Sequence, residues 1–146
     1  MSEPIVIDDE LAAAINGAFD AGKPITVAYV DADGQPHLSF RGSTQAHGKD
    51  QLAIWVREPT GGLLAAIPQN PRMTLMYRDI DRKATYLFYG RAAIVTDKEV
   101  GGAIYDNSPE GERNRDPERG GVAIVIDLDR IQGGPADHRV DMRRNS

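Results

Sequence analysis

Apolar residues recur every four positions near the start of the chain, at Leu11, Ile15 and Phe19. This spacing places them on one side of a helix and predicts a helix from Asp8 to Ala21. The Asp8 side chain can cap the free amides of the first turn, and the acidic residues that follow it suit the positive end of the helix dipole. We therefore expect the chain to start with a short amphipathic helix.

Much of the remaining chain has the composition of β-strands. Six segments combine β-branched and aromatic residues with apolar positions that alternate or run continuously, and turn residues separate them. The predicted strands are residues 23–30, 35–42, 51–57, 72–79, 84–97 and 121–131. The sequence DADG between the first two strands is typical of a tight turn, so these strands are expected to form a hairpin.

Two further helical segments interrupt the strands. Residues 60–70 begin with glycines and end at Asn70-Pro71, where the proline disfavours continuation of the helix. Residues 98–119 have a helical first half and a second half rich in Pro, Glu and Arg, which favours a solvated loop or a short helix. The fold class is therefore α+β, with six mainly antiparallel strands expected to close into a β-barrel and two or three flanking helices.

The length and the apolar content predict one domain. A chain of 146 residues with 40% hydrophobic content can bury a single core. We expect the domain to span residues 1–132 and residues 133–146 to form a loose tail. Residues 51–57 and 84–96 are apolar on both faces, and the chain has too few helices to cover them all. A second subunit would supply the missing cover, so we expect a homodimer.

Charge and composition narrow the function classes. The formal net charge is -5 at pH 7, which argues against nucleic acid as a partner. The sequence contains no cysteine, which excludes disulfides, thiolate metal sites and cysteine nucleophiles. The acidic start lacks a basic segment followed by an apolar one, and no later apolar run approaches the length needed to cross a membrane. We therefore expect a cytoplasmic protein that is not bound to a membrane.

Several familiar catalytic motifs do not occur. The sequence TGGLL has no Lys-Ser or Lys-Thr after its glycines, so it is no phosphate-binding P-loop. The three histidines lack the spacing of metal ligands, and we predict no metal site. Ser43 is not part of a G-x-S-x-G nucleophile motif. The sequence by itself names no catalytic residue.

A polar and basic cluster lies between two apolar strands. Arginine side chains, hydroxyl groups and the free amides of a helix start together suit an anion, most naturally a phosphate ester. The alternative is that the two arginines pair with acids on a solvated rim and that the hydroxyls serve the turns. The candidate residues are Arg41, Gly42, Ser43, Thr44, Arg57, Thr60, Gly61 and Gly62.

A family resemblance supports the binding hypothesis. The run GQPHLSFRGSTQAHGKDQLAIWVREPTGGLLAAIPQNPRMTLMYRD, followed by ATYLFYGRAAIVTD, resembles the flavin-binding split β-barrel superfamily related to pyridoxamine 5'-phosphate oxidase. The similarity extends over residues 25–128, and it rests on the order and spacing of the motifs. It implies a split β-barrel that forms a homodimer, with two FMN sites at the subunit interface.

The resemblance also assigns roles to individual residues. Arg41 matches the arginine at the start of the strand that contacts the flavin, and the next three residues match positions along the flavin ring. Arg57 matches a strand end beside the phosphate. Thr85 lies where the family places a polar side chain near the flavin pyrimidine. These are expectations from the resemblance, and none follows from residue spacing alone.

The sequence also departs from the oxidase pattern. Ala46 replaces a lysine, and Gly61, Gly62 and Leu63 replace a Ser-Arg-Lys run at the start of the middle helix. The C-terminal Arg- and His-bearing substrate segment is also missing, so we do not expect pyridoxamine 5'-phosphate oxidase activity. A sister branch of short chains uses a deazaflavin coenzyme, whose longer tail would need less positive charge at this point.

These features lead to two functional hypotheses. The first is an FMN- or deazaflavin-dependent oxidoreductase that transfers a hydride to or from a small organic substrate, with the cofactor supplying the reactive atom. The alternative is a non-catalytic protein that binds or sequesters a flavin, a deazaflavin or a haem-like ligand in the same cleft. The sequence does not distinguish the two.

Overall fold

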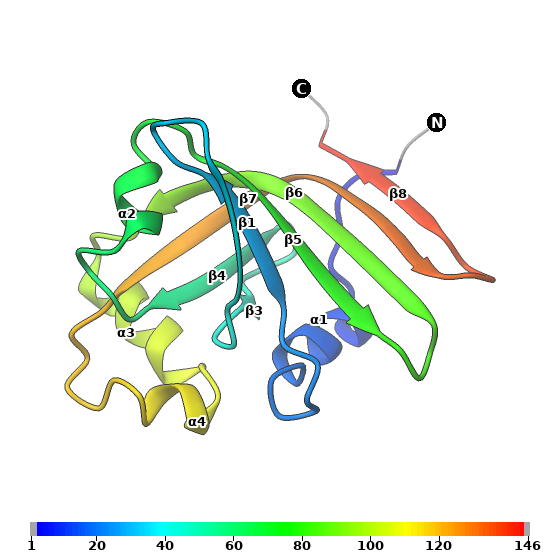
Figure 1. The fold of residues 1–146 in the computed structure, drawn as a ribbon. Helices are drawn as coiled ribbons and strands as arrows, with labels where there is room; N and C mark the ends of the chain where they lie inside the picture. Colours follow the sequence, from blue (N-terminus) through cyan, green and yellow to red (C-terminus); the bar gives the residue numbers. More distant parts are fainter. Residues whose placement is uncertain (1–2, 145–146) are drawn as a thin grey trace.

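The structure is a computed structural model that describes residues 3–144 as one antiparallel sheet with short helices around it (Figure 1). In chain order the elements are α1 (Asp9–Asn16), β1 (Thr26–Val30), β2 (Pro36–Phe40), β3 (Gln45–Ala46), β4 (Gln51–Val56), α2 (Gly62–Ala66), β5 (Arg72–Asp79), β6 (Ala84–Ile94), α3 (Lys98–Asp106), α4 (Glu110–Arg113), β7 (Val122–Pro135) and β8 (Val140–Arg143). The predicted α+β class is confirmed.

The sheet is curved but not closed. Its strand order is β2-β1-β5-β6-β7-β4-β3, and β8 pairs with β7 outside this path. The edge strands β2 and β3 follow each other in sequence, so residues 41–44 cross directly from one edge of the sheet to the other. This is a split β-barrel, as expected. All six predicted strands are present, and the structure adds β3 and β8.

The prediction of a loose tail at residues 133–146 is wrong for the part that the structure describes. β7 continues to Pro135 and pairs with β8 through four residue pairs, Arg130–Arg143 to Gly133–Val140. Gly133 and Gly134 have φ angles of 117° and 113°, and a side chain on Gly133 would overlap the Thr85 carbonyl oxygen. Glycine here lets the strand continue where sequence pattern favours a loop. Residues 145 and 146 lie outside the described residues.

The helices are shorter than predicted. α1 ends at Asn16, and its N-cap Asp8 accepts a hydrogen bond from the Leu11 amide at 2.8 Å, as expected. The segment after β6 forms two helices, α3 and the four-residue α4. Within residues 3–144, no helix combines the length and the apolar content needed to cross a membrane.

One apolar core fills the concave side of the sheet. The side chains of Ile54, Phe88 and Ile126 have no exposed surface, and Leu11 and Ile15 of α1 pack into the same cluster. α1 lies beneath the curved sheet in Figure 1. Burial of this continuous apolar surface is the main driving force for the fold.

The opposite face of the sheet is only partly covered. Behind β4 and β7, Ile104 of α3 packs against Ala53 and Ala123. The two-sided burial of β4, interpreted above as a sign of a second subunit, is thus achieved within one chain. Farther along the same face, Leu38 and Phe40 of β2 are 74% and 70% exposed.

The β-bulge between β6 and β7, in which Asp129 of β7 is the extra residue, requires glycine at position 90 of β6. The pairing of β6 with β7 shifts register between Tyr89 and Gly90, and a Cβ on Gly90 would overlap the Asp127 carbonyl oxygen. We expect Gly90→Ala to lower the free energy of unfolding by about 1–3 kcal/mol, because the backbone must shift to make room. Gly101→Ala in α3 is the control, since its Cβ would meet only Val95 at 4.0 Å. Equal midpoints in urea for both variants would contradict this account.

Candidate functional site at the barrel split

Residues 41–44 are hydrogen-bonded to both edges of the sheet. The Arg41 amide donates to the Ile25 carbonyl at 2.9 Å, which extends the β2 side. On the other side, the Ser43 Oγ donates to the Trp55 carbonyl at 2.9 Å and accepts from the Trp55 amide at 3.0 Å. The Thr44 Oγ1 donates to the Arg41 carbonyl at 2.7 Å and tightens the turn. The crossing segment therefore has a defined path.

A pocket of about 270 Å³ opens at this crossing. Aromatic side chains form part of its wall, three arginines surround it, and one carboxylate lies inside it. The lining residues are Phe19, Pro24, Phe40, Arg41, Gly42, Ser43, Trp55, Arg57, Glu112 and Arg115. We call this cavity the barrel-split pocket.

Its polar groups are incompletely paired. Within residues 3–144, the buried Arg41 Nε has no hydrogen-bond partner. The Glu112 side chain is only 11% exposed, and the nearest cationic atom is the Arg57 Nε at 3.8 Å from its Oε2. That distance is longer than a hydrogen bond. Buried donors in proteins are usually paired, and an oxygen atom of a ligand would supply the partner that the Arg41 Nε lacks.

Asp116 holds the loop beside the pocket in place. Its carboxylate accepts from the Trp55 indole Nε1 and from the amides of Gly120 and Gly121, each at 2.9 Å. The Tyr105 hydroxyl donates to the Asp116 carbonyl at 3.0 Å. Burial by itself would raise the pKa of Asp116, but the three hydrogen bonds and nearby Arg57 together hold that pKa below its ordinary value.

Four of the predicted site residues meet in this pocket: Arg41, Gly42, Ser43 and Arg57. Thr44 is buried beside them, but its hydroxyl bonds the backbone. The Ser43 hydroxyl is also engaged with the backbone of Trp55. Both side chains therefore shape the pocket, and both hydroxyls are already hydrogen-bonded to backbone groups of the protein.

The other predicted residues lie elsewhere. Thr60 and Gly61 line a separate open hollow at the start of α2, and the Gly61 amide already donates to the Glu58 carbonyl at 3.0 Å. A Cβ on the neighbouring Gly62 would lie 3.0 Å from the Tyr29 hydroxyl. Thr85 lies in β6 and accepts from Arg78 Nη1 at 2.8 Å. One chain by itself does not gather all the predicted residues into one cavity.

Sequence reasoning missed six of the lining residues, namely Phe19, Pro24, Phe40, Trp55, Glu112 and Arg115. Phe19 was assigned to the apolar side of the first helix, and Glu112 and Arg115 fall in the segment interpreted as solvated. No local pattern marks them, because their neighbours in the pocket are distant in sequence. Among the described residues, no three His, Cys, Asp or Glu side chains are grouped as metal ligands.

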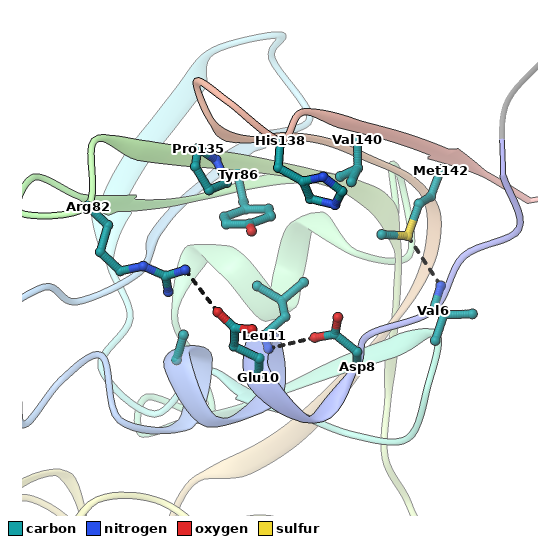
Figure 2. Close-up of a pocket in the computed structure, with 11 residues that line it drawn as sticks. Val6, Asp8, Glu10, Leu11, Arg82, Tyr86, Pro135, His138, Val140 and Met142 are labelled. Carbon is teal, nitrogen blue, oxygen red and sulfur yellow. Dashed lines mark hydrogen bonds and ion pairs between the residues drawn. The ribbon is translucent and has the colours of Figure 1, made fainter.

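A second cavity, of about 280 Å³, lies between α1 and the β7–β8 hairpin. Figure 2 shows the Tyr86 hydroxyl and the His138 ring turned toward this space. Its charged groups already have partners: Arg82 pairs with Glu10 at 2.9 Å, and Asp8 caps α1. It contains none of the predicted residues, so the barrel-split pocket is the stronger candidate.

Comparisons with known proteins agree with this architecture. The model of a family described as pyridoxamine 5'-phosphate oxidase matches residues 7–132. A comparison with curated protein sequences finds no significant match.

Solved structures share the fold at low sequence identity. HupZ of Group A Streptococcus aligns with a TM-score of 0.66 and 22% identity over 96% of this chain and 99% of that chain. A pyridoxamine 5'-phosphate oxidase-related, FMN-binding protein of Nostoc punctiforme aligns with a TM-score of 0.70 and 12% identity over 92% of this chain and 90% of that chain. A heme-binding protein of Mycobacterium smegmatis aligns with a TM-score of 0.65 and 15% identity over 90% of this chain and 57% of that chain. These similarities establish the fold.

Protonation of the Asp116 carboxylate at low pH should release the loop that it holds, which contains Gly120 and Gly121. Because the folded-state pKa of Asp116 lies below 3.8, its stabilising contribution is present above that pH and is lost as the pH falls through the folded-state pKa. The chain has one tryptophan, so Trp55 emission reports on the loop. We expect an acid transition in that emission below pH 3.8, which Asp116→Asn removes.

The matched control is Asp141→Asn on β8, which removes another carboxylate whose pKa is lowered, in that case by Arg130. This variant should keep the Trp55 transition. An Asp116→Asn protein with an unaltered transition would show that Asp116 does not control the loop.

Proposed function

This chain belongs to the pyridoxamine 5'-phosphate oxidase family, and on that premise we propose that it binds a flavin at the barrel-split pocket and acts as an oxidoreductase. One observation carries the proposal: Arg41 lines a pocket with aromatic walls, and its buried Nε has no hydrogen-bond partner among the described residues. Arg41 is also the residue that the family resemblance assigns to the flavin. An unpaired guanidinium group suits an oxygen of the cofactor.

The residues of the pocket suit the parts of a flavin. Phe19, Phe40 and Trp55 offer apolar and aromatic surface to a planar ring. Arg41 and Arg57 offer hydrogen-bond donors to carbonyl, hydroxyl or phosphate oxygens. Ser43 does not need to touch the cofactor, because its bonds to Trp55 position the crossing segment.

A bound flavin would supply the hydride-transfer chemistry itself, so the protein needs no dedicated acid or base. The role of the chain is to bind and orient the cofactor, and to leave one side of it open to a small organic substrate. FMN is the first choice of cofactor, since a Nostoc relative with this fold is an FMN-binding protein. A deazaflavin coenzyme is the alternative, which Ala46, Gly62 and Leu63 favour because they supply no positive charge.

We also propose that two copies of the chain complete the site. A pocket of about 270 Å³ is below the range of about 300–1,000 Å³ that is typical of ligand sites. On the outer face of the sheet, Phe40 and Met76 both pair with Thr26, and Leu38 lies two residues away on the same side. These exposed apolar side chains, which we call the apolar patch, lie on one face of β2 and β5 on either side of β1, and Phe40 also lines the pocket; this arrangement suits a second copy of this chain.

A second candidate function is binding without turnover. A heme-binding protein of Mycobacterium smegmatis shares the fold, and the same pocket could store or carry a ligand. The absorption spectrum of the purified protein identifies the chromophore. Addition of NADPH or reduced deazaflavin then separates an enzyme, which turns over, from a binding protein, which does not.

Arg41→Met tests the flavin site directly. Loss of a charge-assisted hydrogen bond of about 1.5–3 kcal/mol should weaken flavin binding by about ten- to a hundredfold. Quenching of Trp55 fluorescence during titration with FMN measures the dissociation constant. Arg72→Met is the control, because Arg72 is exposed at the start of β5. Equal affinity in wild type and Arg41→Met would contradict the proposed site.

Leu38→Glu tests the proposed dimer. Placing a charge in the apolar patch should dissociate the dimer, since like charges from two copies would be desolvated together. Light scattering after gel filtration gives the mass. Val100→Glu on α3 is the control, because Val100 is exposed outside the patch. A wild-type protein that is monomeric at micromolar concentration would refute the dimer.

A further inference from the structure

Glu112 is an unusual member of a pocket that is otherwise basic. Its carboxylate is nearly buried, and its one ion pair within the described chain, to Arg57, is 3.8 Å long. The Arg91–Asp129 pair shows what a structural ion pair looks like in the same protein, with two bonds of 3.0 and 3.1 Å. The Glu112–Arg57 contact is therefore not explained as a tight structural ion pair.

The fold nevertheless holds Glu112 firmly in this position. A Cβ on Gly42 would overlap both the Glu112 Oε1 and the Phe19 ring, so the carboxylate lies directly against the backbone of the crossing segment. A Cβ on Gly111 would come within 2.9 Å of the same ring. Two glycines thus permit the approach of α4 to Phe19. The hydrogen bond that the Trp55 indole donates to the Asp116 carboxylate holds the chain just after α4.

The charge of Glu112 changes what the pocket can bind. Arg41, Arg57 and Arg115 would by themselves attract a phosphate, but the Glu112 carboxylate beside them offsets one of their three positive charges. A doubly charged phosphate placed there meets a fixed negative group in a partly desolvated site. A hydroxyl, a carbonyl or a singly charged group meets much less repulsion.

We propose that Glu112 is a specificity-determining residue that selects against a terminal phosphate dianion in the barrel-split pocket and favours a cofactor group with less negative charge. This inference rests on the proposed flavin binding, and it moves the choice of cofactor from FMN toward the deazaflavin alternative. It revises the expectation that Arg57 grips the phosphate, because Glu112 shares the pocket with Arg57. It agrees with the loss of basic residues at Ala46 and Gly62.

Affinities for riboflavin and FMN, which differ only in the terminal phosphate, test the proposal. Both are titrated against the full-length wild type and Glu112→Gln, with Trp55 fluorescence as the readout. Glu112→Gln keeps the shape and removes the charge, so the preference for FMN over riboflavin should rise by about tenfold. Glu118→Gln is the matched control, because it makes the same charge change at an exposed position in the following loop, and it should leave the ratio unaltered.

An unaltered FMN-to-riboflavin ratio in Glu112→Gln would overturn the proposal, as would an equal rise in the Glu118→Gln control. If neither flavin binds any of the proteins, the proposed flavin function fails, and inorganic phosphate then decides the role of Glu112. Phosphate should raise the midpoint of thermal unfolding more in Glu112→Gln than in wild type and Glu118→Gln. An equal phosphate effect in all three proteins would overturn the role of Glu112.

Discussion

The two hydrogen bonds between the Ser43 hydroxyl and the backbone of Trp55 are the constraint on which the candidate site depends. The chain must cross from one open edge of the sheet to the other, and an unpaired strand edge exposes amide and carbonyl groups that need partners. The Ser43 hydroxyl supplies a donor for the carbonyl and an acceptor for the amide of Trp55 in β4. This contact places Arg41 and Gly42 at the opening of the split, where both line the pocket.

The same pocket depends on a segment far away in sequence. α3 covers the outer face of β4 through Ile104, and this packing delivers α4 and the following loop to the split. Asp116 then connects that loop to the Trp55 indole. Core packing and site geometry are therefore coupled through Trp55, whose backbone holds the crossing segment and whose side chain holds the loop.

The fold by itself does not specify a reaction. Structures with this architecture include an FMN-binding protein and a heme-binding protein, each at low identity to this chain. What differs among such proteins is the small set of side chains at the site. In this chain the site holds Glu112 among three arginines, next to the glycines Gly42 and Gly111 that admit it. The ligand specificity of this protein should depend on the balance of charges in the pocket more than on the sheet.

The sequence by itself determined six of the eight strands, the first helix with its Asp8 cap, and the α+β class, because those features depend on local periodicity and turn chemistry. It also indicated Arg41, Gly42, Ser43 and Arg57, which the structure brings together. Only the tertiary structure decided that β7 passes Gly133 to pair with β8, since that step needs close approach to the Thr85 carbonyl. Likewise Glu112 reaches the pocket through contacts between segments that are far apart in sequence, which no local pattern encodes.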